Sequence, residues 1–170
     1  MMTRFILLSL LLFASCRPYD VFDKWANHYF KDEPAVSGDL LRRIAQVESS
    51  MDARAISPAG ARGIMQIEPE TFRWIQSKEP ALAGLHVDEL FNVDVNVRAA
   101  TWYLRWLWDQ WPNRPARERL KYVLGSYNAG IGHIRRADKD TWARTEIALC
   151  AETSSASCHQ TQKYVREILP

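Results

Sequence analysis

The sequence lacks a long hydrophobic run, a strong excess of either charge, and any repeated or low-complexity segment. No apolar stretch reaches the roughly 18 residues that a membrane-spanning helix needs. The chain of 170 residues has 22 Lys and Arg against 20 Asp and Glu, and this near-neutral balance argues against nucleic acid as the main partner. Hydrophobic residues make up 47% and charged residues 25%, which argues against a disordered or fibrous chain. The length of 170 residues indicates a single domain.

Strand-like alternation of polar and apolar residues is also nearly absent. Apolar residues recur instead at helical spacing. Ser37 suits a helix N-cap, Pro69 suits a first helical turn, and Gly130 suits the left-handed residue that ends a helix. We therefore predict an all-α fold with short loops and with helices over residues 37–51, 69–77, 94–111, 115–129 and 159–169.

The start of the chain has the pattern of a bacterial export signal. Arg4 is followed by ten mostly apolar residues, Phe5–Ala14, which are too few to span a bilayer. Cys16 then follows small residues, as in a lipobox, where the Cys is lipidated and becomes the first residue of the mature protein. Phe13 stands where lipoboxes usually carry Leu, Val or Ile, so a plain signal peptide followed by an incidental Cys is the alternative.

The segment after Cys16 precedes the main body of the chain. Phe22, Trp25 and Tyr29 have helical spacing, which predicts a short amphipathic helix that packs onto the domain; a mobile spacer fits the same composition. The predicted organisation is a signal peptide at 1–15, a lipidated Cys with a tether or short helix at 16–36, and one domain at 37–170.

Three cysteines are present, at Cys16, Cys150 and Cys158. An odd number in an exported protein leaves one thiol unpaired. Lipidation of Cys16 would use that thiol, so we expect a disulfide between Cys150 and Cys158. A metal site is less favoured because only His159 lies near as a further ligand. We expect no metal and no cofactor.

One charge in the helix predicted over 37–51 lies on its apolar side. At 100° per residue, Glu48 falls within a stripe of apolar residues, which are Leu40, Leu41, Ile44, Val47 and Met51. No Lys or Arg stands three or four residues from Glu48, and the last turn of a helix disfavours an anion. Both features raise the pKa of the carboxyl group, as a general acid requires near neutral pH. The alternative is a Glu at the margin of the stripe that faces water or a distant Arg.

Residues 44–66 read IAQVESSMDARAISPAGARGIMQ, and residues 125–130 read GSYNAG. These segments resemble the signatures of the lysozyme-like lytic transglycosylases, the soluble and membrane-bound murein transglycosylases related to goose-type lysozyme. That family shows a Glu-Ser pair, a loop like Ser-Pro-x-Gly-Ala-x-Gly-Leu-Met-Gln, and Tyr-Asn-Ala-Gly near the end of a later helix. The counterparts here begin at Glu48, Ser57 and Tyr127, and a closing Tyr-Val pair is found at Tyr164.

The resemblance covers residues 37–170 and implies an α-helical lysozyme-like domain with a saccharide-binding groove. It implies that Glu48 is the catalytic acid and base. It also implies that Ser57, Gln66 and Tyr127 hold the sugar beside it and that Asn128 lies at the active site, although Asn128 also suits a helix stop.

Glu68 departs from the pattern of this family, which often has Met in Gln-x-Met-Pro. The carboxylate either joins the site as a second acid or begins the next helix, where an anion is favoured. We favour the helix-start role.

A single acid is enough when the substrate supplies the nucleophile, whereas most glycosidases need two carboxylates. In peptidoglycan, the N-acetyl group of N-acetylmuramic acid can attack its own anomeric carbon. The resemblance thus implies a lytic transglycosylase that cleaves the β-1,4 bond to N-acetylglucosamine and leaves a 1,6-anhydro end. The alternatives are a lysozyme-type hydrolase that uses water with Glu68 or Asp52, and a catalytically silent wall-binding lipoprotein.

The same features predict where the protein acts. Arg17 follows Cys16, and no Asp holds the position that commonly retains lipoproteins at the inner membrane. We therefore expect a lipid anchor in the outer membrane, facing the periplasm. The expected partners are peptidoglycan glycan strands and, through the anchor, the membrane; the sequence identifies no protein partner.

Overall fold

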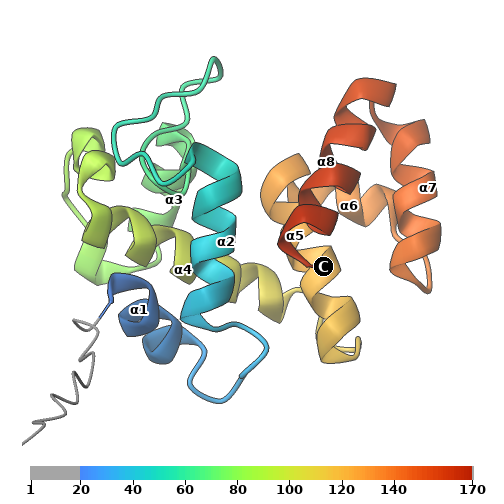
Figure 1. The fold of residues 1–170 in the computed structure, drawn as a ribbon, viewed down its shortest axis with the longest axis horizontal. Helices are drawn as coiled ribbons and strands as arrows, with labels where there is room; N and C mark the ends of the chain where they lie inside the picture. The colour runs from blue at the N-terminus through green and yellow to red at the C-terminus, as the bar shows by residue number, and fades with distance from the viewer. Residues whose placement is uncertain (1–19, 170) are drawn as a thin grey trace, which may run out of the picture.

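The computed structural model describes residues 20–169, which form eight α-helices and no β-strand (Figure 1). The predicted all-α class is confirmed. Two 3-10 helices, η1 and η2, lie between α3 and α4. The elements are α1 (Val21–Tyr29), α2 (Gly38–Ser49), α3 (Pro69–Gln76), η1 (Pro80–Leu82), η2 (Val87–Phe91), α4 (Val93–Asp109), α5 (Ala116–Ala129), α6 (Ile131–Ala137), α7 (Trp142–Glu152) and α8 (Ser155–Ile168).

The predicted signal peptide at 1–15 and the predicted lipidation site Cys16 lie outside the described residues. Within residues 20–169, no helix combines the length and the apolar character that crossing a membrane requires. The helix expected within 16–36 is α1. It packs against α2 and α4 and buries Phe22 and Trp25, so these residues form part of the core and not a spacer.

The helix boundaries follow local signals in the sequence. Ser37 is the N-cap of α2 and accepts a hydrogen bond from the Leu40 amide at 3.3 Å. The helix predicted from 159 starts earlier, because Ser154 caps α8 by accepting from the Ser157 amide at 3.2 Å. Gly130 ends α5 with a φ of 83° but an extended ψ of 135°, so the chain passes directly into α6 instead of adopting the predicted left-handed helical stop.

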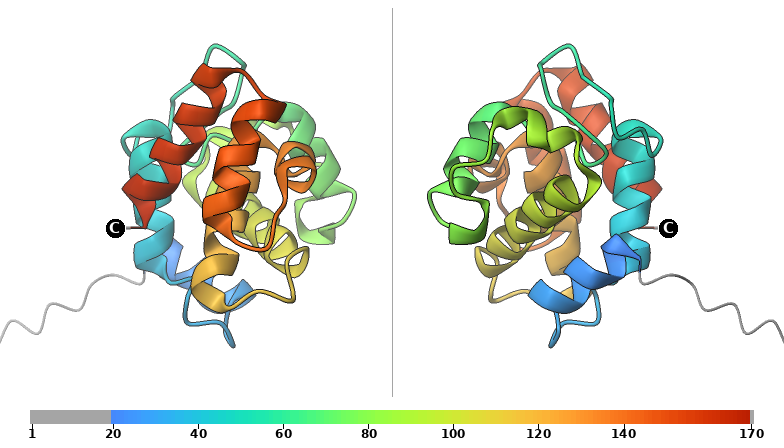
Figure 2. Two further views of the ribbon diagram at one scale, coloured as in Figure 1. Left: turned by 90° about the vertical axis from the view of Figure 1, so that its right-hand side faces the viewer. Right: turned by 90° about the vertical axis from the view of Figure 1, so that its left-hand side faces the viewer.

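The helices form two groups that meet along α4 and α5 and along α2 and α8 (Figures 1 and 2). Trp108, Tyr122 and Phe72 are the largest fully buried side chains and fill the interior of these groups. Cys150 of α7 and Cys158 of α8 form a disulfide with their Cα atoms 5.0 Å apart. The last two helices are therefore joined covalently as well as by packing.

Helices α6 and α7 have no counterpart in the sequence-based prediction. Thr141 at the N-cap of α7 makes no side-chain capping bond, and Ile147 on this helix is 74% exposed, so the amphipathic pattern is weak. The capping bond comes from a distant residue: Glu118 of α5 accepts from the Trp142 amide at 3.0 Å. Trp142 also packs against Gly125, where a Cβ atom would lie 2.4 Å from the indole ring.

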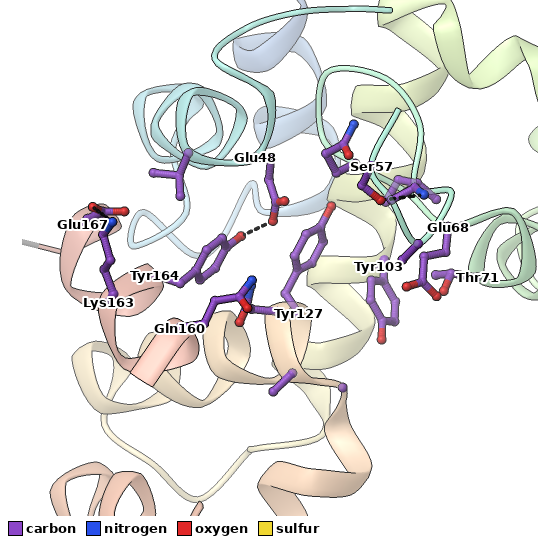
Figure 3. Close-up of a pocket in the computed structure, with 18 residues that line it drawn as sticks. Glu48, Ser57, Glu68, Thr71, Tyr103, Tyr127, Gln160, Lys163, Tyr164 and Glu167 are labelled. Atoms are coloured by element: carbon purple, nitrogen blue, oxygen red, sulfur yellow. Dashed lines mark hydrogen bonds and ion pairs between the residues drawn. The ribbon is translucent and has the colours of Figure 1, made fainter. Parts of the chain in front are cut away.

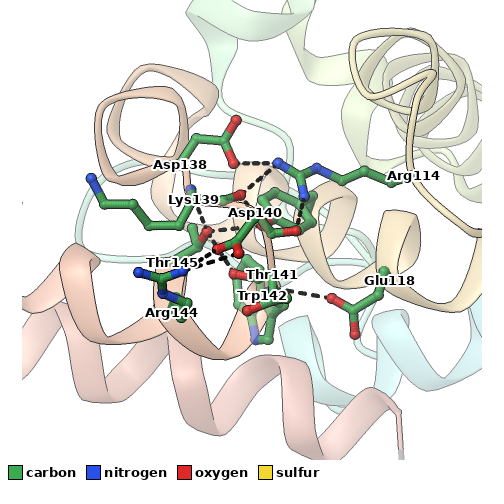
Figure 4. Close-up of polar contacts among 10 residues, drawn as sticks. Arg114, Glu118, Asp138, Lys139, Asp140, Thr141, Trp142, Arg144 and Thr145 are labelled. Carbon is green, nitrogen blue, oxygen red and sulfur yellow. Dashed lines mark hydrogen bonds and ion pairs between the residues drawn. The ribbon is translucent and has the colours of Figure 1, made fainter.

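Arg114 fixes the loop between α6 and α7, as Figure 4 shows. Its guanidinium donates to the carboxylate of Asp138 and to the carbonyl oxygens of Lys139 and Asp140, at 2.8 Å and 3.0 Å for the two carbonyls. The same group lies 3.7 Å from the centroid of the Tyr122 ring. The loop before α7 is thus held by charged and aromatic contacts of the residue Arg114, which directly precedes the N-cap of α5.

The Glu118 contacts predict a pH-dependent contribution to stability. Burial alone would raise the pKa of Glu118, but the hydrogen bonds from Lys121 and the Trp142 amide, with the nearby cations of Lys121 and Arg114, lower it. Its stabilising effect is therefore present above the pKa of the unfolded chain and is lost as pH falls through the lower native value. We expect Glu118→Gln to reduce the free energy of unfolding at pH 7 by about 1 kcal/mol. The effect is small because the ion pair between Glu118 and Lys121 is partly exposed to solvent.

Urea denaturation at pH 7 and at pH 3 measures this difference, which is expected to shrink at the lower pH. The control is Glu89→Gln, which alters an exposed carboxylate without a side-chain partner among the described residues. An equal loss for Glu118→Gln at both pH values would contradict the assignment.

Candidate active site

A groove of about 700 Å³ lies between the end of α2, the loop that follows it, and the helices α5 and α8 (Figure 3). The structure brings together in this groove all five residues that the sequence nominated for catalysis and substrate binding. They are Glu48, Ser57, Gln66, Tyr127 and Asn128. Glu48 and Asn128, which are 80 positions apart in the chain, thus line one cavity.

Glu48 projects into the groove from the last turn of α2. Burial raises the pKa of its carboxyl group to about 7, and the hydrogen bond from Tyr164 acts in the opposite direction. The Tyr164 hydroxyl donates to Oε1 at 2.6 Å, which leaves Oε2 to carry a proton. No described Lys or Arg forms an ion pair with Glu48, in accord with the absence of a local cation in the sequence. The group can therefore be protonated near neutral pH and ionise during a reaction.

Tyr164 comes from α8 and is the contact that the sequence analysis did not assign. The closing Tyr-Val pair was visible in the sequence, but nothing in the sequence places its hydroxyl against Glu48, 116 residues away. Burial and the neighbouring Glu48 raise the pKa of Tyr164 well above its usual value. The phenol therefore stays neutral and remains a hydrogen-bond donor to the carboxylate.

Tyr127 of α5 faces Glu48 across the groove, but its hydroxyl donates a hydrogen bond within the protein. Its hydroxyl donates to the carbonyl oxygen of Met65 at 2.7 Å. Burial, with Glu48 and Tyr103 nearby, raises its pKa well above the usual value, so it does not ionise. Tyr127 thus ties α5 to the loop over residues 50–67, and its oxygen is left to accept a hydrogen bond from a ligand.

The loop over residues 50–67 folds back on itself beside Glu48. The Ser57 hydroxyl oxygen accepts from the Ala61 amide at 3.1 Å, which leaves its proton for a ligand. Gln66 has a φ of 51°, and its Nε2 donates to the carbonyl of Gly63 at 2.8 Å. The amide oxygen of Gln66 is therefore the part of this side chain that suits an N–H donor from a bound sugar.

Asn96 of α4 holds this loop in place through its side chain. The sequence analysis did not predict it as a site residue. It is fully buried, accepts from the Met65 amide at 2.9 Å, and donates to the carbonyls of Leu90 at 2.8 Å and Arg62 at 2.9 Å. Gly63 is required here, because a Cβ atom would lie 2.1 Å from the Leu90 carbonyl oxygen. A polar residue among apolar neighbours, the signal that singled out Glu48, also marks Asn96.

Glu68 stands at the N-cap position of α3, as predicted, but its side chain makes no capping hydrogen bond. The carboxylate is exposed and lines the groove near Thr71 and Tyr103 (Figure 3). After burial, the charge of Glu68 is the second cause that raises the pKa of Tyr103. Glu68 therefore belongs both to the helix start and to the groove wall.

The described residues contain no group of three or more His, Cys, Asp or Glu side chains arranged to hold a metal ion. Besides the five nominated residues, the polar side chains on the groove wall belong to α3, α4 and α8. They are Thr71, Tyr103, Gln160, Lys163, Tyr164 and Glu167, with Glu68 before α3.

The hydrogen bond between Tyr164 and Glu48 predicts that removal of the Tyr164 hydroxyl will shift the pKa of Glu48. Because the hydroxyl stabilises the ionised carboxylate, Tyr164→Phe should move the pKa of Glu48 above its value of about 7. Carbon-detected NMR titration of labelled Glu side chains measures this, with Tyr103→Phe as the control that leaves the bond intact. An unchanged or lower pKa in Tyr164→Phe would contradict the contact.

Comparison with known proteins identifies the family of this chain. The family model described as the transglycosylase SLT domain matches residues 26–149. The membrane-bound lytic murein transglycosylase F of Actinobacillus succinogenes is 28% identical over 144 residues, which cover 78% of this chain and 28% of that protein. The protein of the same name from Yersinia enterocolitica is 33% identical over 120 residues, which cover 65% and 23%.

Two solved structures share the fold. The 70-kDa soluble lytic transglycosylase of Escherichia coli superposes with a TM-score of 0.66 at 23% identity, over 89% of this chain and 23% of that one. An inactive mutant of the lytic transglycosylase Slt of Pseudomonas aeruginosa gives a TM-score of 0.69 at 22% identity, over 89% and 23%. The chain spans less than a third of the length of these relatives. Because the family model covers well over half of its residues, the chain belongs to the transglycosylase SLT domain family.

Proposed function

We propose that this chain is a peptidoglycan lytic transglycosylase that cleaves the β-1,4 bond between N-acetylmuramic acid and N-acetylglucosamine and forms a 1,6-anhydro end. The observation that carries the proposal is the carboxyl group of Glu48, half-buried in the groove with a pKa raised to about 7 and a phenol bound to one oxygen. Membership of the SLT family supports the same substrate class.

In the proposed reaction Glu48 acts in both steps, first as a general acid and then as a general base. Protonated Glu48 donates to the oxygen that bridges the two sugars, while the N-acetyl carbonyl oxygen of the muramic acid attacks its own anomeric carbon and the bridging bond breaks. The Glu48 carboxylate then takes the proton of the 6-hydroxyl, and this oxygen displaces the N-acetyl oxygen. The proton count balances without water. Proton transfer of this kind typically contributes about 10²–10⁴-fold to the rate.

The groove supports each step with a neutral side chain. Tyr164 donates to Glu48 and so stabilises the carboxylate that forms after the first proton transfer. The amide oxygen of Gln66 suits the N–H of the N-acetyl group, and the Ser57 hydroxyl suits a sugar oxygen. Tyr127 and Asn128 complete the wall opposite Glu48.

The hydrolase alternative needs a second carboxylate to activate water. Asp52 does not line the groove and accepts from the Arg54 amide at 2.8 Å in the turn after α2. Glu68 does line the groove, but its carboxylate is exposed beside Tyr103 and Thr71. The lyase proposal therefore expects Glu68 to be dispensable for the chemical step.

Mass analysis of the products released from peptidoglycan tests the proposal. The wild type should release ends one water lighter than hydrolysed ends. Glu48→Gln keeps the shape of the side chain but has no acidic proton, so we expect its clearing of a murein suspension to fall by about 10²–10⁴-fold. Glu68→Gln should retain anhydro products at a rate within a few-fold of the wild type.

Hydrated reducing ends would overturn the lyase proposal, and their loss in Glu68→Gln would identify the hydrolase. Equal clearing by Glu48→Gln and the wild type would exclude Glu48 as the acid. Binding of murein without clearing by either protein would favour a silent wall-binding protein.

We further infer that the protein acts at the cell envelope and is anchored in the outer membrane, facing the periplasm, through a lipid on Cys16. Three features of the sequence support this inference: the apolar segment at 5–14, the lipobox-like position of Cys16, and the lack of Asp after it. The names of the relatives, which are membrane-bound lytic murein transglycosylases, agree with it.

Cys16→Ser should abolish incorporation of labelled fatty acid and move the protein from the membrane fraction to the periplasm. The control Cys150→Ser removes a different cysteine and should leave the label and the fractionation unchanged. Density-gradient separation of the membranes then shows whether the wild-type protein fractionates with the outer or the inner membrane. Label retained in Cys16→Ser would contradict lipidation, and recovery of the wild type with the inner membrane would contradict the sorting.

A further inference from the structure

A run of aromatic side chains leaves the groove between α3 and α4. It begins at Tyr103, which lines one end of the groove beside Thr71 (Figure 3). The ring of Tyr103 lies 5.7 Å from the ring of Tyr127 inside the groove and 5.9 Å from the ring of Trp106, one turn further along α4. On α3, Trp74 follows Thr71 by three residues and so lies on the same face of that helix. The aromatic run is therefore continuous with the groove wall.

Four of these rings form one patch, which we call the aromatic platform: Trp74, Trp102, Tyr103 and Trp106. The ring of Trp74 meets the other three edge to face, at 4.8 Å from Trp106, 5.6 Å from Trp102 and 6.0 Å from Tyr103. The rings of Tyr103 and Trp106 are within 10° of parallel. All four side chains are half-buried, and their inner parts pack on the core. Mutual contact thus fixes the orientation of the rings before any ligand arrives.

The polar atoms of the platform are open to solvent. None of its three indole N–H groups, nor the Tyr103 hydroxyl, pairs with another residue within 20–169, whereas the indole of Trp25 donates to Asp94 at 3.1 Å. Over the same residues, the side-chain N and O atoms that are both buried and unpaired belong to Trp108, Trp111 and Ser126, which lie outside the platform. The platform therefore combines apolar ring faces with four hydrogen-bonding groups that a ligand can reach.

This combination suits a sugar strand. One face of a pyranose ring presents C–H groups, which pack on the negatively polarised face of an aromatic ring, and its hydroxyls accept from N–H and O–H donors at the ring edges. The four platform side chains are uncharged, as are the hydroxyl and acetamido groups of a glycan. Trp also gathers at membrane surfaces. The continuity of the platform with the groove, through Tyr103 and Thr71, favours the glycan over the lipid surface.

We propose that the aromatic platform is a distal glycan-binding site, which holds sugar residues of the strand beyond those in the groove. The inference rests on the proposed function, because the strand that reaches the platform is the one whose bond Glu48 would cleave. Binding energy from these remote sugars would help to hold the strand in place at Glu48. The protein would then cleave long strands more efficiently than oligosaccharides that fill the groove alone.

The test compares kcat/KM on long glycan strands with kcat/KM on a tetrasaccharide, both free of peptides. Trp102→Leu removes the ring that contacts Trp74 but does not line the groove. We expect about a tenfold loss on long strands, the effect of one aromatic contact, and no change on the tetrasaccharide. The matched control is Tyr29→Leu, which removes a half-buried ring on α1 outside the groove and the platform and should change neither value.

A binding measurement without turnover is the second arm. Every protein carries Cys16→Ser, so that no lipid anchor contributes, and Glu48→Gln, so that the strand is not consumed. Long peptide-free strands should change the tryptophan fluorescence of this protein, and adding Trp102→Leu should raise the Kd about tenfold. Circular dichroism checks that each variant keeps its helical content.

Three results would overturn the distal site. They are an equal loss on both substrates in Trp102→Leu, no loss on either, and strand binding that Trp102→Leu leaves unchanged while it abolishes binding to vesicles of phosphatidylethanolamine and phosphatidylglycerol. The last result would assign the platform to the membrane. Anhydro products from the tetrasaccharide test the lyase itself, so failure of the distal site and failure of the proposed function are distinguishable.

Discussion

The hydrogen bond between Tyr164 and Glu48 joins the last helix of the domain to the second one, and the candidate active site depends on it. Glu48 needs α8 above it to be removed from water, since burial is the main cause of its raised pKa. The same helix supplies the phenol that limits this rise and keeps one carboxylate oxygen in place. A carboxyl group on α2 alone would be an ordinary, ionised surface acid. Packing of α8 on α2 therefore converts it into a group that can give and recover a proton.

Another part of the groove wall depends on the loop over residues 50–67, which has almost no regular structure of its own. Three side chains hold it from three directions: Asn96 from α4, Tyr127 from α5 and Ser49 from α2, whose hydroxyl donates to the Ile64 carbonyl at 2.8 Å. Each of them bonds to backbone groups of the loop, so the loop side chains remain available to a ligand. Positions such as Ser57 and Gln66 are thus preorganised by contacts that other residues make with the backbone of the loop.

The sequence predicted those features that depend on short-range patterns. Helical spacing predicted α2 and α5, and capping chemistry predicted Ser37 as an N-cap. The position of an acid inside an apolar stripe predicted the buried environment of Glu48. The features it did not predict depend on partners far along the chain. The start of α7 is capped by Glu118 from α5, and the partner of Glu48 comes from α8. Neither contact leaves a periodic signal in the local sequence. The cavity of about 340 Å³ beside the groove likewise arises only when α5, α6 and the segment between Cys150 and Cys158 meet.

The half-buried acid also makes a pH-dependent contribution to the stability of the domain. The native pKa of Glu48 is about 7, against 4.5 for a solvated Glu, so between these values the folded protein holds a proton that the unfolded chain has released. Stability must therefore fall as pH rises from the lower value through the higher one, by a total on the order of 3 kcal/mol from this group. Below that window the group contributes nothing to the balance, because both states are protonated. The contribution of Glu48 alone therefore makes the domain more stable in mildly acidic than in neutral surroundings, which is also the range in which this carboxyl group is protonated.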